Sequence, residues 1–295
     1  MLRSSSRSAA IIGVMERIRP PAVAGSFYPA DCDELSRLID ECFVSSPLGP
    51  QGVSSSAPSL VGGLVPHAGY VYSGACAAHL YARLGRSIQR VILLGVNHRG
   101  HGGRAALSPA NVWRTPLGPV AIDHEVSGLL QNQISFLTLD EAPHAQEHSI
   151  EVQLPFLQRV LGRFTLVPVS LGHLSVEECA ELGAAIAEIC AAQSQSPNRP
   201  VILASSDLSH YLSPEKTAEL DKIALDEVLA LNPHGLLEVV ERYDITMCGA
   251  LPTAVLLFAA QALGVERASL LKHCHSGEAT TMRRVVGYAS VAVES

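Results

Sequence analysis

Short, uninterrupted apolar runs alternate with helical patterns over most of this chain, and this alternation constrains its fold more than any other feature. The apolar runs lie at residues 60–65, 90–96, 164–169, 200–204, 268–273 and 285–293. Helical spacing of apolar side chains predicts helices at residues 33–43, 74–84, 147–161, 175–191, 214–231 and 251–263. Continuous apolar strands are typical of sheets buried on both faces, and strand–helix alternation favours parallel pairing. We therefore expect a single α/β domain with three layers, α/β/α, around a mostly parallel central sheet.

The composition excludes several classes of protein. Hydrophobic residues make up 47% and charged residues 17% of the 295 positions, which excludes a disordered chain. The net charge of −7 argues against a nucleic-acid-binding surface. Seven cysteines without a C-x-x-C pair are typical of a reducing compartment, so we expect a cytoplasmic protein. No serine-hydrolase elbow, phosphate loop or dinucleotide fingerprint is present in its expected context.

Two segments resemble targeting or membrane sequences and need interpretation. Residues 245–265 carry no charge over 21 positions, but polar residues and Pro252 interrupt them. We interpret this stretch as a buried helix and expect no membrane association. Residues 1–14 are rich in Arg and Ser, as targeting segments are. We interpret residues 1–17 as a disordered or mis-assigned extension that precedes a domain at residues 18–295.

Polar side chains follow three of the apolar runs at the point where each predicted strand ends. His67 follows the first, His98 follows the second, and Asp207 and His210 follow a third. A single His after a strand is commonly a capping or hydrogen-bonding residue. However, the carboxyl ends of strands in an open α/β sheet border the binding crevice. Three strand ends that carry such residues predict a binding or catalytic site at one edge of the sheet.

Cys248 is a further candidate, because it precedes the predicted helix at 251–263 in the segment DITMCGALP. A thiol near a helix N-terminus has a lowered pKa and so more thiolate, the form that binds metals. The alternative is an inert cysteine in the core, the more common role of a buried thiol.

The segment HAQEHSIE allows two interpretations. His144, Glu147 and His148 match the H-x-x-E-H pattern of one class of zinc peptidases, which requires both imidazoles on one helix face. Pro143 stands just before the pattern and would disturb a helix there. In the other interpretation, His148 and Glu151 lie one turn apart and place a single imidazole in the crevice.

Several of these segments together resemble a known family. IRPPAVAGSFYPAD, PHAGYVYSG, LLGVNHRG, EHSIEVQLPF, SSDLSHY and MCGALPTAVLL occur in that order across almost the whole chain. They look like the Memo family (mediator of cell motility), whose prokaryotic members are often labelled AmmeMemoRadiSam system protein B. The resemblance implies a fold similar to that of the LigB-like class III extradiol dioxygenases, which hold a non-haem Fe(II).

The resemblance also implies a set of site residues. A metal site of two His and one Cys would comprise His67, His98 and Cys248. His101 follows closely and could compete with His98 as a ligand. Three further pocket positions match His148, Asp207 and His210. Of these, His148 or His210 would act as general base, and Asp207 would fix the tautomer of a neighbouring His.

From this ligand set we expect a metal-dependent redox protein that uses Fe(II) or Cu(I), with Zn as a further candidate. In this set a thiolate replaces the carboxylate that such oxygenases usually have, and a thiolate is itself oxidisable. We therefore favour metal-linked redox chemistry over ring cleavage of a catechol. An alternative is a non-catalytic protein that uses the same pocket to bind a peptide or partner. The family label further implies radical-SAM and AMMECR1-like partner proteins.

Overall fold

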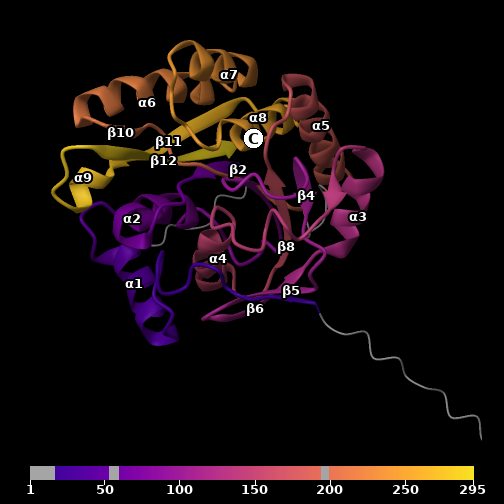
Figure 1. The fold of residues 1–295 in the computed structure, drawn as a ribbon, viewed down its shortest axis with the longest axis horizontal. Coiled ribbons are helices and arrows are strands. Elements are labelled where there is room, and N and C mark those ends of the chain that lie inside the picture. The colour runs from indigo at the N-terminus through magenta and orange to yellow at the C-terminus, as the bar shows by residue number, and fades with distance from the viewer. Residues whose placement is uncertain (1–16, 53–59, 194–198) are drawn as a thin grey trace, which may run out of the picture.

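Four of the six strands predicted from the apolar runs, those at 60–65, 90–96, 164–169 and 200–204, lie in the central part of the sheet (Figure 1). The computed structural model describes residues 17–52, 60–193 and 199–295, so the predicted extension lies outside the described residues except for Arg17. Five parallel strands form the core of the sheet, in the order β6 (Gly118–Ile122), β8 (Thr165–Leu171), β3 (Arg90–Val96), β9 (Val201–Ser205) and β2 (Leu60–Val65). The predicted bounds of β2 and β3 are confirmed to the residue.

Antiparallel strands extend this parallel core on both sides. Beyond β2 the sheet continues with β12 (Val285–Glu294), which pairs with both β11 (Arg267–His275) and β10 (His210–Leu212). Beyond β6 it continues with β5 (Val112–Thr115) and β1 (Ile18–Arg19). Two short strands, β4 (Ala105–Leu107) and β7 (Thr138–Leu139), pair beside the carboxyl half of β8. The sheet is therefore mostly parallel at its centre and mixed at its margins.

Successive residues of the central strands enter two different hydrophobic clusters, which explains the uninterrupted apolar runs. In β3, Val91 and Leu93 pack on one face of the sheet, while Ile92 and Leu94 pack on the other. All four side chains are fully buried. Because successive side chains of a strand point to opposite faces, a strand covered on both faces must be apolar at every position.

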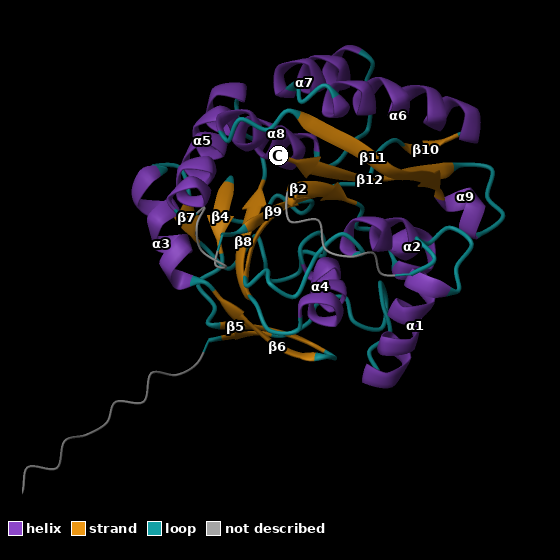
Figure 2. Ribbon diagram, turned by 180° about the vertical axis from the view of Figure 1, so that it is seen from behind, coloured by secondary structure: helices purple, strands orange, loops and turns teal. Residues whose placement is uncertain are grey.

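Helices cover both faces and complete the three layers, as Figures 1 and 2 show from opposite sides. One face carries α1 (Cys32–Val44), α2 (Tyr70–Tyr81) and α4 (Leu154–Leu161). The other carries α3 (His124–Gln133), α5 (Val176–Ala192), α6 (Pro214–Leu229), α7 (Pro233–Arg242) and α8 (Ala250–Ala262). The described residues also form a 3-10 turn (Glu151–Gln153) and the short α9 (Ser276–Ala279). The predicted α/β/α architecture is confirmed.

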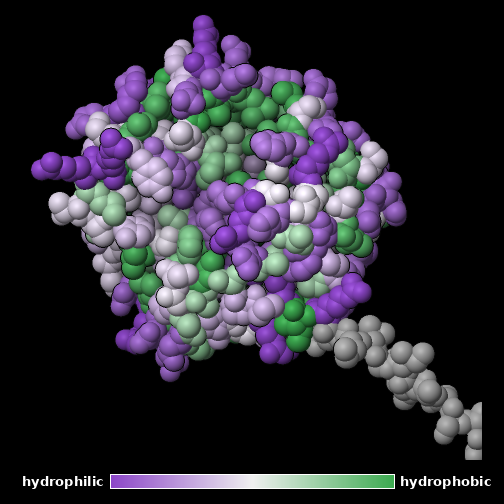
Figure 3. All heavy atoms as spheres, in the orientation of Figure 1, coloured by the Kyte–Doolittle hydropathy of each residue, from purple (hydrophilic) through white to green (hydrophobic). Residues whose placement is uncertain are grey.

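The uncharged stretch at 245–265 contains α8, whose buried side chains pack against α5 and the central strands. Among the described residues, no helix has both the length and the apolar character needed to cross a membrane. The space-filling view shows a surface that is mostly hydrophilic on this face, with an apolar region in its upper part (Figure 3).

The helix predicted at 147–161 is wrong in its first half. The chain forms turns up to Ile150, then the 3-10 turn, and α4 begins only at Leu154. Pro155 in the first turn of α4 explains the late start, because proline is tolerated at a helix start but not in the interior. Upstream, the Glu147 carboxylate accepts the backbone N–H groups of His148 and Ser149 and stabilises a turn there instead.

Candidate metal site

Three strand ends meet at one edge of the sheet and bring their polar side chains together. His67 follows β2, His98 follows β3 and Asp207 follows β9, which pairs in parallel with both of those strands. The His67 and His98 ring centroids are 5.1 Å apart and nearly perpendicular. The parallel core of the sheet thus places these residues around one pocket.

Cys248 reaches the same place from the loop before α8. Its Sγ lies 3.1 Å from Nε2 of His67. Gly249 makes this approach possible, because a Cβ there would lie 2.4 Å from the Cβ of Ser206. The Gly249 N–H instead donates to Ser206 Oγ at 2.8 Å, which ties the loop to the end of β9.

One ligand atom from each of His67, His98 and Cys248 lies within 4.8 Å of the others. Ligand atoms bound about 2.0–2.3 Å from one ion in tetrahedral geometry are about 3–4 Å apart. The three side chains can therefore hold one transition-metal ion after small adjustments.

A buried serine fixes the tautomer of His67. Ser205 Oγ donates its proton to the Ser149 carbonyl at 2.6 Å and accepts from the Gln153 amide at 2.8 Å. Its 3.0 Å contact with Nδ1 of His67 must therefore be donated by the imidazole. This leaves the Nε2 lone pair of His67 free for a metal and directed toward Cys248.

A buried carboxylate orients the other two imidazoles. Glu147 Oε1 lies 3.0 Å from Nδ1 of His98 and 3.1 Å from Nδ1 of His148. Burial raises the pKa of Glu147, but hydrogen bonds from His148 and His98 and their nearby charge outweigh burial and hold it well below its usual range. The carboxylate thus accepts from both rings and leaves each Nε2 free. The His98 and His148 rings stack with centroids 4.6 Å apart.

Before a metal binds, a neutral imidazole is favoured at His67 and a protonated thiol at Cys248. Burial, followed by the charges of His148 and His98, holds the pKa of His67 well below its usual range. Burial, followed by the charge of Asp207, raises the pKa of Cys248 to about 12. The prediction that the helix N-terminus lowers this pKa is therefore wrong, because burial outweighs the helix. A bound cation would lower the pKa of the Cys248 thiol and so favour the thiolate.

Asp207 and His210 also line the pocket, but they contact backbone groups. Asp207 Oδ1 accepts the backbone N–H of His67 at 2.8 Å, and burial raises the pKa of its carboxyl. We expected Asp207 to fix the tautomer of a neighbouring His, but the residue that contacts the His67 ring is Ser205. His210 donates from Nδ1 to the Thr246 carbonyl at 2.8 Å, which leaves its Nε2 free.

Two of the predicted alternatives are not supported by the geometry. His101 is exposed and outside both the ligand group and the pocket, so His98 is the better placed of the two. His144 is fully buried, with Nε2 3.2 Å from the Ala106 carbonyl, and it does not share a helix with His148. The peptidase interpretation required that helix.

Glu151 does not place an imidazole in the crevice. Its carboxylate is fully buried and accepts from Arg19, Tyr28 and the backbone of residues 22–23. The residue that positions His148 is Glu147, which sequence reasoning considered only as part of the peptidase pattern. Its position beside His148 in HAQEHSIE was an available but weak signal.

The pocket has a volume of about 550 Å³, a size typical of sites for small organic molecules. Its walls carry Phe27, Tyr72 and Tyr288 beside the imidazoles. Exposed Tyr211 and Met282 stand at its rim. The pocket can therefore admit an organic ligand next to the candidate metal ligands.

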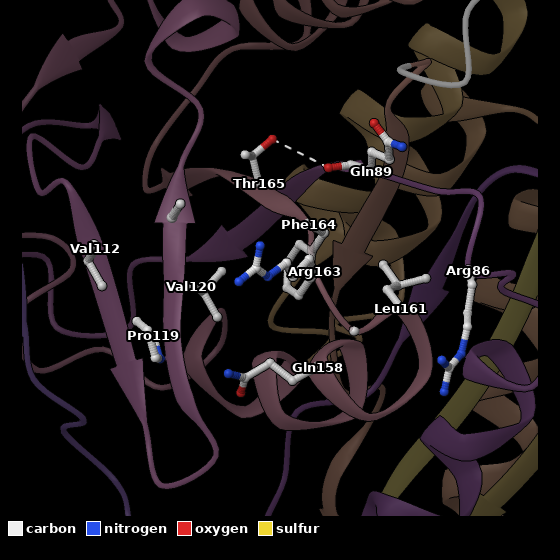
Figure 4. A pocket seen from close by; sticks show the side chains of 12 residues that line it. Arg86, Gln89, Val112, Pro119, Val120, Gln158, Leu161, Arg163, Phe164 and Thr165 are labelled. Atoms are coloured by element: carbon white, nitrogen blue, oxygen red, sulfur yellow. Dashed lines mark hydrogen bonds between the residues drawn. The ribbon is translucent and has the colours of Figure 1, made fainter.

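A larger cavity of about 770 Å³ lies at the opposite edge of the sheet (Figure 4). It lies between β6 and α4, beside Gln89 and Phe164, which precede β3 and β8. Its described lining includes no His, Cys, Asp or Glu. The larger of the two cavities therefore has no candidate metal ligand in its described lining, whereas the smaller pocket at the carboxyl ends of the strands does.

Comparisons with known proteins identify the family of this chain. The family described as Memo-like protein matches residues 19–292. A MEMO1 family protein of Ignicoccus hospitalis is 43% identical over 282 residues, covering 93% of this chain and 98% of its own. One from Methanocaldococcus jannaschii is 40% identical over 292 residues, covering 95% of this chain and 100% of its own. Among solved structures, an uncharacterized protein of Escherichia coli K12 shares the α/β fold, with a TM-score of 0.51 and 14% identity over 72% of this chain and 88% of its own. The chain therefore belongs to the Memo family.

Proposed function

We propose that this protein binds one iron or copper ion through His67, His98 and Cys248 and performs metal-dependent redox chemistry on a small organic substrate. The observation that carries the proposal is the orientation of the three side chains. Each imidazole donates its Nδ1 proton to a buried acceptor, and one ligand atom of each side chain lies within 4.8 Å of the others. Such buried acceptors are typical of metal-binding histidines.

The donor chemistry suits a redox metal. Imidazole is a ligand for iron, copper and zinc, and thiolate shifts the preference toward softer ions such as Cu(I) or Zn(II). When bound, the ion would supply Lewis acidity and, for iron or copper, electron transfer. Three protein ligands leave coordination positions open for a substrate.

The remaining pocket residues would act on the substrate itself. His148 and His210 each present a free Nε2, so either can accept a proton from a substrate hydroxyl. Asp207 holds the backbone of His67 in place. The aromatic walls orient the substrate and exclude water from the inner end of the pocket.

Elemental mass spectrometry after purification without oxygen tests the proposal. We expect near-stoichiometric iron or copper in the wild-type protein and in His101→Ala, and its loss in His67→Ala. A metal-loaded protein would then be screened for oxygen consumption with small aromatic and thiol substrates. Absence of metal after reconstitution would reject the metal site, and zinc retained by His67→Ala would place the ion elsewhere.

Metal affinity is expected to rise with pH, since the pKa of Cys248 is raised to about 12 and the ion must displace the thiol proton. Below that pKa, one displaced proton makes the affinity rise about tenfold per pH unit. His67 adds no proton competition, because its pKa is held low. Competition titrations with a chelator between pH 6 and 8 measure this slope, which Cys248→Ala should flatten. A flat wild-type profile would show that the thiol is not a ligand.

Glu147→Gln is expected to lower metal affinity about 10- to 100-fold, the usual effect of losing a residue that orients metal-binding histidines. The change removes the charged acceptor shared by His98 and His148. Chelator competition measures the affinity, and thermal denaturation checks that the fold is retained. Glu125→Gln, which alters an exposed carboxylate, is the control. Unchanged affinity in a folded Glu147→Gln protein would contradict the account.

A further inference from the structure

Arg284 stands at the rim of the candidate metal pocket. It lies immediately before β12, is exposed, and is one of the residues that line the pocket. Within the described part of the chain, no hydrogen bond or ion pair engages its guanidinium. By contrast, Arg83, Arg90 and Arg159 each contact a carboxylate of this chain. A guanidinium free at a pocket rim is available to a ligand.

The charges around the pocket favour an anionic ligand at this rim. Asp207 is the only carboxyl side chain among the described lining residues, and it is 5% exposed and bonded to the His67 backbone. Glu147 lies behind the imidazoles, 3% exposed, and contacts His98 and His148. Arg284 is the only Arg or Lys in that lining. In a chain of net charge −7, one unpaired cation at the rim distinguishes anionic from neutral ligands.

The walls between the rim and the imidazoles suit a flat apolar body. Phe27 packs against the His148 ring, with centroids 4.5 Å apart. Tyr72 and Tyr288 form other parts of the wall, and Val286 lines it beside them. Aromatic faces of this kind bind planar rings by offset or edge contacts, and a volume of about 550 Å³ accommodates one or two fused rings.

We propose that the ligand of this pocket is a small aromatic carboxylate. Its carboxylate pairs with Arg284 at the rim, and its ring lies between the aromatic walls with the far edge toward the imidazoles. A guanidinium pairs with a carboxylate through two parallel N–H donors, which also sets the orientation of the ring. The inference rests on the proposed function for the role of the inner end, whereas the contact at Arg284 requires no metal.

Isothermal titration with 2-naphthoate and its neutral analogue 2-naphthamide tests the inference. The proteins compared are the wild type, Arg284→Gln and Arg283→Gln. Arg283 is the matched control, because it is the exposed neighbour with the same charge but does not line the pocket. We expect naphthoate to bind about five- to tenfold more weakly to Arg284→Gln only, with naphthamide affinity equal in all three. The naphthoate affinity of the wild type should also fall with added salt, since the pair is exposed.

Other outcomes would overturn the inference. Equal weakening in Arg283→Gln would show a general effect of net charge. A further variant, Arg163→Gln, alters a residue that lines the cavity of Figure 4, and weakening in this variant alone would place the ligand there. Absence of naphthoate binding would reject the ligand class. Each titration is run on metal-free and metal-loaded protein, so the two proposals fail separately. Stoichiometric metal without Arg284-dependent binding rejects this inference alone. Arg284-dependent binding by a protein that takes up no metal on reconstitution rejects the metal site alone.

Discussion

Cys248→Ala is expected to lower the affinity for iron or copper by at least about a hundredfold, more than the loss of an orienting residue costs. The thiol lies 3.1 Å from Nε2 of His67 and supplies the only anionic ligand of the proposed set. Without it, two imidazoles alone would have to hold the ion. Affinity is measured by chelator competition without oxygen, and Cys274→Ala is the control, since that buried thiol lies outside the ligand group.

A second variant at the same position tests the role of the thiolate in metal choice. Cys248→Asp creates the two-His-one-carboxylate ligand set of non-haem Fe(II) oxygenases. We expect it to retain Fe(II) better than Cys248→Ala and to lose Cu(I) more than Fe(II), because carboxylate is the harder ligand. Equal binding of both metals by wild type and both variants would show that the ion binds elsewhere.

Glu151→Ala is expected to lower the free energy of unfolding by about 3–5 kcal/mol, because it leaves a charged partner buried. Glu151 and Arg19 pair at 2.5 Å, with side chains 0% and 1% exposed. The same carboxylate accepts from the Tyr28 hydroxyl at 2.6 Å and from the N–H groups of Ala22 and Val23 at 2.8 and 3.0 Å. Urea denaturation followed by circular dichroism measures the loss.

Asp40→Ala is the matched control for this change. Asp40 pairs with Arg159 at 2.8 Å, but both side chains are about half exposed, at 52% and 47%. Exposed pairs contribute about 0–1 kcal/mol, so the control should lose no more than that. Similar small losses in both variants would contradict the assigned role of the buried pair.

Because Arg19 also donates to the carbonyls of His144 and Glu147, Glu151→Ala should weaken the metal site as well.

The sequence predicted the central strands well because burial on both faces leaves a continuous apolar signal. β2 and β3 have the predicted bounds, and their carboxyl ends carry His67 and His98 as the pattern indicated. The strands of two to five residues β1, β4, β5, β6, β7 and β10 were not predicted, since such short segments give little periodicity. The helix predicted from residue 147 failed because the Glu147 carboxylate and Pro155 act through local contacts that periodicity does not represent.

The candidate site was predictable only in part for a similar reason. Strand ends identify which residues lie at the crevice, but they do not identify hydrogen-bond partners. Ser205 and Glu147, which set the orientation of the imidazoles, became recognisable only once the fold had placed them behind the rings. Cys248 comes from a loop far along the chain, so only the family resemblance selected it. Its pKa was predicted in the wrong direction, because burial of the thiol cannot be read from sequence.

X-ray absorption at the metal edge of the loaded protein identifies the ligand atoms around the ion. We expect one sulfur scatterer at about 2.3 Å and at least two nitrogen scatterers at about 2.0–2.1 Å from the ion. The sulfur shell should disappear in Cys248→Ala and persist in Cys274→Ala. A spectrum with nitrogen and oxygen scatterers only in the wild-type protein would contradict the assignment of His67, His98 and Cys248 as the metal ligands.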